Sequence, residues 1–184
     1  NPLSYLLRKT WQYSDGNKSK IVLYWAMFIT ANIVELVPGP IIWAKIIDVI
    51  TKQGITKENI GLLLTLLSLT VLIDVLFWGF HGPARLIERI NAFKARASYR
   101  KHLLKGVMSL PMEWHVDHHS GDTIDRIEKG ASGLYSFSEN SFLVISAIVQ
   151  FVVSYAMLIY FSPSSSFIVL GMILISIWIT MRFD

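Results

Sequence analysis

Imidazole and carboxylate side chains gather in one short polar stretch of this 184-residue sequence. His115, Asp117, His118, His119 and Asp122 stand within eight consecutive positions. Both side-chain types are ordinary zinc ligands, so the stretch raises the question of a metal site. Trp114 directly precedes these residues, and one large aromatic side chain amid polar groups is typical of a surface that docks another protein.

The run Asp117-His118-His119 resembles the acid-His-His motif of certain phosphoesterases. Those enzymes need an α/β fold and further carboxylates from strand ends, whereas this sequence shows no strand-like alternation of apolar and polar residues. We therefore expect a solvated docking tip with no metal ion and no catalytic residue. A metallohydrolase that uses the histidines stays open as a third alternative.

Two carboxyl groups stand inside otherwise apolar runs. Glu35 lies in the run 21–44 and Asp74 in the run 60–80. An ionisable group inside a membrane-spanning helix is costly and by default marks a substrate or proton path. Counted along straight helices, Glu35 lies about 21 Å and Asp74 about 9 Å from the inner ends of their spans, so we expect no direct pairing. Both are candidate substrate-path residues; a protonated or hydrogen-bonded structural carboxyl is the alternative.

Long apolar runs define the elements that carry these groups. Residues 140–181 contain no charged side chain, and a helix of that length would be about 63 Å long, roughly twice the thickness of a bilayer core. Pro163 and its neighbouring serines interrupt the run, so it predicts two membrane-spanning helices joined by a hairpin. With the two upstream runs, we predict an all-α membrane protein with four transmembrane helices. The predicted ranges are 21–48 for the first span, with a bend at Pro38 and Pro40, 60–110 for the second with a cytoplasmic extension, 122–161 for the third with its extension, and 166–184 for the fourth.

Composition and charge support this class. Hydrophobic residues make up 53% of the chain and charged residues 16%, which disfavours a disordered chain and a soluble enzyme. The net charge of +4 could suggest a nucleic-acid partner, but nine of the 17 Lys and Arg residues lie between Arg85 and Lys129. By the positive-inside rule, the N-terminus, this middle loop and the C-terminus lie in the cytoplasm, and two short loops lie outside. We predict a multi-pass protein of the cell (inner) membrane, in contact with the lipid bilayer and without a nucleic-acid partner.

The basic middle loop has the pattern of a helical hairpin. Two apolar seams recur at steps of three, four or seven residues, as in helices that pack lengthwise on one another. The first comprises Leu86, Ile90, Phe93, Ala97, Leu104 and Val107, and the second Ile124, Ile127, Ala131 and Leu134. Spans two and three therefore extend into a long antiparallel cytoplasmic hairpin, with a tip at 112–121. We expect Arg126 to pair with a carboxylate of this hairpin such as Asp122 or Glu88.

The N-terminal segment 2–14 is predicted to be an amphipathic helix. Leu3, Leu7 and Trp11 recur at helical spacing, and Arg8 and Lys9 lie on the other side. Such a helix lies in a membrane interface or packs on protein, and the sequence leaves both alternatives open.

The tip resembles the first cytoplasmic loop of ATP-binding-cassette (ABC) exporters. That loop reads Pro, a few residues, two aromatics, an acid, then Gly-acid-aliphatic-x-x-Arg-aliphatic. Here Pro111, Gly121, Asp122, Arg126 and Ile127 stand where the family has them. Trp114 takes the first aromatic position, while His115 replaces the second aromatic, Val116 the usual acid, and Gly130 a common Asp. The order of elements agrees along essentially the whole chain: an elbow helix, two spans, a long basic hairpin and two more spans.

This resemblance implies that residues 1–184 form part of a single exporter transmembrane domain that lines a substrate path. It implies that the tip is a coupling helix that rests on a cytoplasmic ATP-binding domain, followed by the stalk motif of Gly121, Asp122 and Arg126. The tip residues concerned are Trp114, His115, Val116, Asp117, His118, His119 and Ser120. The expected partners are this ATP-binding domain, a second transporter half, as a homo- or heterodimer, and an unknown exported substrate.

No G-x-x-x-x-G-K-[ST] phosphate loop occurs in the sequence, so it offers no cradle for nucleotide phosphates. We expect no cofactor on this chain, with ATP and Mg²⁺ implied for the parent protein as an ATP-hydrolysing translocase. Because the first residue is Asn1, we expect the sequence to be part of a longer polypeptide. The alternative function is a membrane scaffold or sensor subunit that signals through its cytoplasmic stalk.

Overall fold

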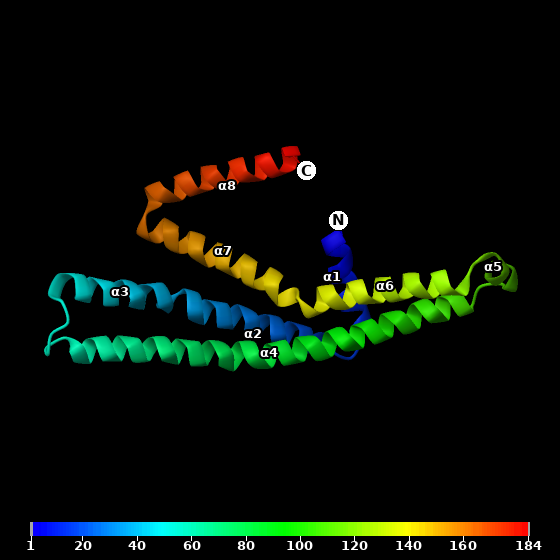
Figure 1. The fold of residues 1–184 in the computed structure, drawn as a ribbon, viewed down its shortest axis with the longest axis horizontal. Coiled ribbons are helices and arrows are strands. Elements are labelled where there is room, and N and C mark those ends of the chain that lie inside the picture. Colours follow the sequence, from blue (N-terminus) through cyan, green and yellow to red (C-terminus); the bar gives the residue numbers. More distant parts are fainter. Residues whose placement is uncertain (1, 184) are drawn as a thin grey trace. The chain divides into compact units, whose positions relative to one another are not determined.

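The computed structural model describes residues 2–183 and consists of helices joined by short turns (Figure 1). Within those residues no strand occurs. The predicted ranges 1–184 and 166–184 include the terminal residues 1 and 184, which lie outside the described part. In chain order the helices are α1 (Pro2–Tyr13), α2 (Lys18–Leu36), α3 (Pro38–Gln53), α4 (Ile60–Met108), α5 (Met112–Asp117), α6 (Ser120–Glu139), α7 (Ser141–Phe161) and α8 (Pro163–Phe183).

Four helical stretches of the described chain are long and apolar enough to cross a membrane. They are Lys18–Gln53, Ile60–Met108, Ser120–Phe161 and Pro163–Phe183. A helix satisfies its own backbone hydrogen bonds, which is the condition for crossing a hydrocarbon layer without water. The predicted fold class, an all-α membrane protein with four spans and a long helical hairpin, is confirmed.

The first of these stretches is broken in the middle. α2 ends at Leu36 and α3 begins at Pro38, with Val37 at the N-cap position between them. Pro38 has no backbone N–H to donate and its ring clashes with the preceding turn, which favours a kink or a break in the helix at this position. The break lies where the sequence predicted a bend.

The helices of the hairpin differ in continuity. α4 is one helix from Ile60 to Met108 although Pro83 lies in its interior. The returning chain has a break that the sequence did not predict, because α6 ends at Glu139, Asn140 forms its C-cap and α7 starts at Ser141. We call residues 81–140 the stalk and residues 112–121 its tip.

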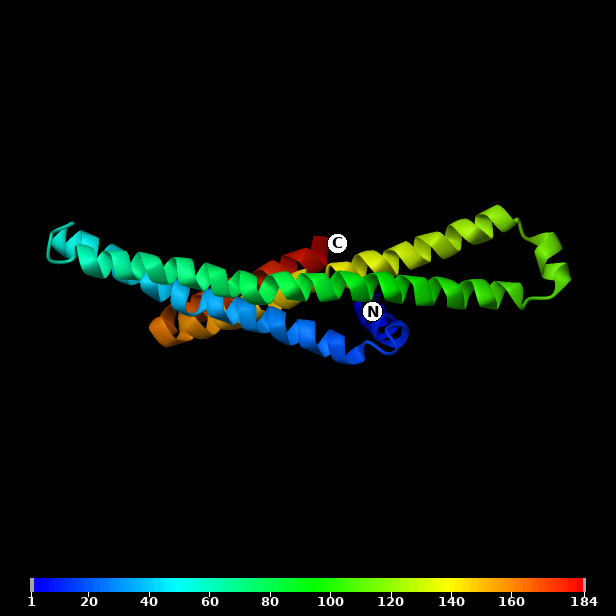
Figure 2. The same ribbon diagram turned by 90° about the horizontal axis from the view of Figure 1, so that it is seen from below.

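The structure divides into two compact units, which we describe separately. Unit 1 holds the described residues up to Ala31 together with Leu76–Ile145, and so contains the whole stalk. In both views α6 runs back along the stalk part of α4 (Figures 1 and 2). The core of unit 1 is a cluster of the buried side chains of Ile21, Tyr24, Phe28 and Ala84, against which Phe142 packs. The base of the stalk is therefore held by residues of α2, α4 and α7.

Unit 2 holds Asn32–Val75 and the described residues from Ser146 onward. α3 lies beside the first part of α4 in both views (Figures 1 and 2), and the buried side chains of Ile46, Val49 and Leu63 join the two helices. Asn32 Nδ2 donates to Ser146 Oγ at 3.1 Å, which links α2 to α7. This unit contains α8 and the part of α7 from Ser146 onward, which together form an apolar hairpin.

The apolar seam predicted for the descending stalk helix is wrong at Leu86, Ile90, Phe93 and Ala97, which are exposed, whereas its last members Leu104 and Val107 are half-buried. Leu86 and Phe93 are 61% and 65% exposed, and Ile90 is exposed too. The buried positions of α4 in the stalk are Ala84, Glu88, Asn91, Ala92 and Ala95. Alanines at these positions let a neighbouring helix approach closely, so small residues and not the large apolar ones mark the inner face.

The seam predicted for the returning helix is confirmed at three positions and wrong at one. Ile127, Ala131 and Leu134 are buried in α6, whereas Ile124, the residue nearest the tip, is exposed. The exposed apolar residues Leu86, Ile90 and Phe93 thus form a stripe on α4 that the described residues leave uncovered, which we call the outer seam.

Candidate functional sites

The tip consists of a short helix with an aromatic pair on it. The ring of Trp114 in α5 stacks on the ring of His118, the residue that follows this helix, with 4.2 Å between the ring centres and an angle of 11° between their planes. His118 Nδ1 lies 2.9 Å from the carbonyl oxygen of Trp114, and His115 packs edge-on to Trp114 at 5.2 Å. Met112 and Val116 on the same helix are strongly exposed. The tip therefore presents apolar side chains around a half-buried tryptophan, which suits contact with a protein surface.

The tip does not bring its histidines and carboxylates together as ligands. Within residues 2–183 no group of three His, Cys, Asp or Glu side chains is placed to hold a metal ion. Asp117 ends α5, His119 is the N-cap residue of α6, and Ser120 is the first residue of α6. His118 is engaged by Trp114 instead. Stacking on Trp114 is the role that the structure gives His118.

The predicted stalk motif lies in the first two turns of α6. Asp122 Oδ2 and Arg126 Nη2 are 3.0 Å apart, both well exposed, so Arg126 takes the first of its two predicted partners. A Cβ atom added to Gly121 would meet nothing within 4 Å, so its surroundings give no packing reason for glycine there. The pair spans one helical turn and stabilises α6 locally.

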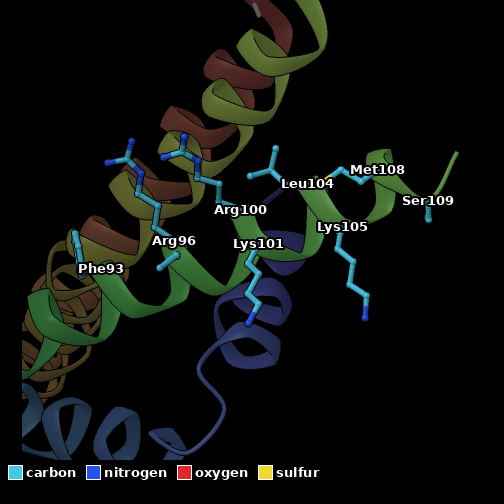
Figure 3. A pocket seen from close by; sticks show the side chains of 9 residues that line it. Phe93, Arg96, Arg100, Lys101, Leu104, Lys105, Met108 and Ser109 are labelled. Atoms are coloured by element: carbon cyan, nitrogen blue, oxygen red, sulfur yellow. The ribbon is translucent and has the colours of Figure 1, made fainter. Parts of the chain in front are cut away.

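An open basic groove lies along the stalk part of α4 near the tip (Figure 3). Its volume is about 820 Å³, and Phe93, Arg96, Arg100, Lys101 and Met108 are among its lining residues. Glu128 of α6 pairs with Arg100 at 2.6 Å and with Arg96 at 3.4 Å. The groove therefore combines the exposed end of the outer seam with cationic side chains.

Sequence reasoning missed a buried carboxylate at the base of the stalk. Glu88 is fully buried, and each oxygen has partners: Ser141 Oγ donates to Oε1 at 2.6 Å, the Phe142 N–H donates to Oε1 at 2.9 Å, and Arg85 Nη1 pairs with Oε2. Because the N–H groups at the start of a helix have no partner within it, Glu88 supplies an acceptor for the first turn of α7 from another helix. We call Arg85, Glu88, Ser141 and Phe142 the clasp.

Arg85 completes the clasp. Its Nη1 atom donates to the carbonyl oxygen of Glu139 at 2.5 Å, at the end of α6, and its guanidinium lies 3.9 Å from the centre of the Phe142 ring. Burial raises the pKa of the Glu88 carboxyl, and the bonds from Ser141, Arg85 and the Phe142 N–H oppose that shift. The break between α6 and α7 is thus fixed to α4. The spacing of Arg85 and Glu88, three residues apart on one helix, was the signal in the sequence.

The N-terminal helix contacts the stalk through a set of hydrogen bonds. Thr10 and Ser138 share a hydrogen bond of 2.8 Å, Ser14 Oγ donates to the Thr10 carbonyl, and Asn91 Nδ2 donates to Ser14 Oγ at 3.0 Å. Leu7 and Trp11 lie towards the same side, since they line one small pocket with Thr10, Phe137 and Ser138, and both stay partly exposed. Contact with protein is therefore observed for α1, and its place in a membrane interface stays a prediction.

The two intramembrane carboxyl groups lie in one cavity of unit 2. It measures about 340 Å³, and Glu35, Trp43, Thr70, Asp74 and Gln150 are among the residues that line it. Glu35 and Asp74 are both exposed, and among the described residues neither takes part in a salt bridge or a side-chain hydrogen bond. The expectation that they do not pair agrees with these contacts, but the depths counted from straight spans placed them too far apart.

The register of α3 against α4 explains why the two carboxyl groups share this cavity. The buried cluster sets Ile42 and Ile46 against Leu63 and Leu66. Antiparallel helices move in opposite chain directions, so following α3 back and α4 forward from this cluster brings Glu35 level with Asp74. This register cannot be obtained from the sequence pattern, and depths counted from the ends of the apolar runs do not replace it.

A helical membrane protein with a stalk between its second and third spans is the class that the fold and these sites define. The family model of the ABC transporter transmembrane region matches residues 22–183, so the chain belongs to this family of ABC transporter membrane domains. The predicted resemblance is therefore confirmed.

A curated relative supports the family assignment. The chain is 25% identical over 181 residues to the "Uncharacterized ABC transporter ATP-binding protein YfiC" of Bacillus subtilis (strain 168). This alignment covers 96% of the chain but only 29% of the relative. No solved structure matches the chain. The chain is thus a membrane-spanning part of an ABC transporter, with several apolar helices crossing the bilayer.

Proposed function

We propose that this chain is the membrane-spanning part of an ATP-driven exporter and that its tip docks on an ATP-binding domain. The observation that carries the proposal is the tip itself: Trp114 is held by His118 on a six-residue helix, and Met112 and Val116 are exposed beside it. A held aromatic with exposed apolar neighbours can fill a pocket on a partner at little cost in side-chain entropy. The relative's printed name, an ATP-binding protein, supports a partner of this kind.

ATP and Mg²⁺ belong, in this proposal, to the ATP-binding domain. The sequence of this chain has no phosphate loop, so its residues do not fit a nucleotide. The clasp and the Glu139 carbonyl that Arg85 contacts would carry movement of the stalk to the start of α7, because they join α4, α6 and α7 at one place.

The substrate path, in this proposal, passes Glu35 and Asp74. Both are exposed and line a cavity, and a carboxyl group inside a membrane span faces protein or water and not lipid. The N-terminus, stalk and C-terminus lie in the cytoplasm of a cell whose inner membrane holds the protein, as the crowding of Lys and Arg in the stalk supports.

A second transporter half would cover the outer seam. Leu86, Ile90 and Phe93 are large, apolar and exposed at three- and four-residue spacing, which is the pattern that a facing helix covers. This arrangement explains why the most regular apolar repeat of the stalk is not used within the described residues. Both a homodimer and a heterodimer would satisfy it.

The test of the proposal is the variant Trp114→Ala in the full-length transporter, reconstituted in liposomes. We expect ATP hydrolysis coupled to transport to fall by about tenfold or more, because a central aromatic anchor is typically worth 2 kcal/mol or more. Tyr160→Ala is the matched control, since Tyr160 is an exposed aromatic at the end of α7, far along the chain from the tip.

Equal coupled hydrolysis in both variants would contradict docking through the tip. A protein that neither binds nor hydrolyses ATP would instead favour the alternative of a membrane scaffold or sensor subunit. ATP binding should persist in Trp114→Ala, because the substitution lies outside the ATP-binding domain.

A further inference from the structure

The cavity in unit 2 has a lining of unusual composition for a membrane span. Residues of four helices contribute to it: Glu35 from α2, Trp43 from α3, Thr70 and Asp74 from α4, and Gln150 from α7. Its volume of about 340 Å³ falls at the lower end of the range of small-molecule sites. Leu36 and Ile73 add apolar wall. A ligand here would meet acceptor groups, an aromatic ring and aliphatic side chains.

The charged groups that line the cavity are all acidic. Glu35 and Asp74 belong to it, while no Lys, Arg or His does within the described residues. Neither carboxyl group is satisfied by a neighbour there, in contrast to the polar pair Asn32 and Ser146, which bond to one another in the same unit. Carboxyl groups at membrane depth are costly without a partner, so this pair favours a cationic ligand.

The break between α2 and α3 adds to the negative character of the cavity wall. Pro38 and Pro40 have no N–H, so the carbonyl oxygens of Val34 and Leu36 lose the donors that a continuous helix would give them. The carbonyl end of α2 lies at this break, and Leu36 and Pro40 line the cavity. The carbonyl end of a helix carries partial negative charge. The same prolines remove two of the free donors with which α3 begins.

Trp43 sets the kind of cation that the cavity suits. Its side chain is 53% exposed and lines the cavity. The face of an indole ring attracts cations whose charge is spread over methyl or methylene groups, such as quaternary ammonium groups. Thr70 Oγ1 donates its proton to the Leu67 carbonyl at 2.7 Å, so towards a ligand it acts as an acceptor. A bare metal ion would use the acceptors but not the ring or the aliphatic wall.

We propose that this cavity binds a small organic cation with an apolar body, and that compounds of this class are substrates of the transporter. The carboxyl groups of Glu35 and Asp74 neutralise its charge, the Trp43 ring covers its cationic group, and Leu36 and Ile73 contact its apolar part. This inference rests on the proposed function, since it names the class of substrate for the path that passes Glu35 and Asp74.

The test measures binding of radiolabelled benzyltrimethylammonium to the full-length protein in lipid nanodiscs without ATP. We expect saturable binding that phenylmethanesulfonate, an anion with the same benzyl group, does not compete away. Glu35→Gln and Asp74→Asn should each raise Kd by about tenfold, because each substitution removes one of the two negative charges that attract the cation. Trp43→Phe should keep most of the affinity and Trp43→Leu should lose it.

Asp48→Asn is the matched control. Asp48 is also a carboxylate of unit 2, on α3, but it pairs with Lys52 at 2.7 Å and does not line the cavity. Its replacement should leave Kd unchanged. Thermal unfolding of each variant shows whether it is folded, and either of Glu35→Gln and Asp74→Asn suffices for the test.

Three results would overturn the inference: no saturable binding, competition by the anion as strong as by the unlabelled cation, or an unchanged Kd in a folded Glu35→Gln or Asp74→Asn protein. Competition by Na⁺ at equal concentration would overturn the organic class in favour of an inorganic cation. ATP hydrolysis and its dependence on Trp114 are measured on the same preparation. If they persist without cation binding, the substrate class is wrong and the proposed function stands.

Discussion

Glu88 in the stalk and the pair Glu35 and Asp74 in the membrane part are surrounded in opposite ways. Glu88 is fully buried, and Ser141, Phe142 and Arg85 occupy its two oxygens. Glu35 and Asp74 are exposed to a cavity and have no such partners among the described residues. A carboxylate with a structural role has hydrogen-bond and ion-pair partners within the protein, whereas a carboxyl group that binds a ligand has none there.

The difference lies in what the neighbouring residues offer. Glu88 has Arg85 one turn away and faces the start of α7, where backbone and serine donors need an acceptor. Glu35 and Asp74 have Trp43, Thr70 and Gln150 near them, and no basic side chain lines their cavity in the described chain. Burial of a charge is tolerated only with partners, so the two sites should respond differently to loss of their carboxyl groups.

Glu88→Ala tests this comparison with the largest expected effect. Arg85 would lose its counter-charge, and Ser141 and the Phe142 N–H would lose their acceptor inside the protein. Removing one partner of a buried ion pair costs about 3–5 kcal/mol, so we expect a protein that unfolds at much lower temperature or fails to accumulate. Thermal unfolding of the full-length protein in detergent measures this loss of stability.

Asp74→Ala is the matched change in the other region. No partner in the described chain depends on the Asp74 carboxyl group, so the midpoint of thermal unfolding should stay the same or rise, even where ligand binding is lost. Equal destabilisation by Glu88→Ala and Asp74→Ala would show that the two sites do not differ in the way described.

The sequence predicted the features that depend on long apolar runs and on the distribution of charge. The four spans follow from runs such as 60–80 and 140–181, since hydrocarbon excludes charged groups over a fixed length. The family resemblance followed from Gly121, Asp122 and Arg126 at their spacing around the tip. These signals are local in the chain and need no knowledge of what packs where.

The features that depend on helix partners were missed. A heptad repeat of Leu86, Ile90 and Phe93 indicates that something covers this face, but not whether it is the neighbouring helix of the same chain. The buried face of α4 in the stalk is instead formed by Ala84, Ala92 and Ala95. Alanine is only weakly hydrophobic, so these positions do not stand out in a hydrophobic pattern. The clasp and the shared cavity of Glu35 and Asp74 need the register between helices, which a sequence pattern does not contain.

Ser14→Ala is expected to cause a loss of stability between those of the other variants. Ser14 Oγ is the acceptor for Asn91 Nδ2, and Asn91 Oδ1 already has no hydrogen-bond partner among the described residues. The substitution would leave the buried Nδ2 group of Asn91 without its acceptor, at a cost of about 1–3 kcal/mol. The midpoint of thermal unfolding should fall, and α1 should become more accessible to protease. Ser98→Ala, at an exposed position of α4, is the control and should change neither; equal effects would argue against the hydrogen bond as the cause.

Asp122→Asn is expected to cause the smallest loss of stability. Asp122 and Arg126 form a pair as short as many buried ones, 3.0 Å, yet both side chains lie in solvent with exposed fractions of 61% and 78%. Water and salt screen such a pair, so its loss should cost about 0.5 kcal/mol or less, close to the error of a thermal unfolding measurement. If Asp122→Asn destabilised the protein as strongly as Ser14→Ala, burial would not be what separates the structural carboxylate Glu88 from the others. A loss of coupled ATP hydrolysis without a change in unfolding would instead assign Asp122 to the docking surface of the tip.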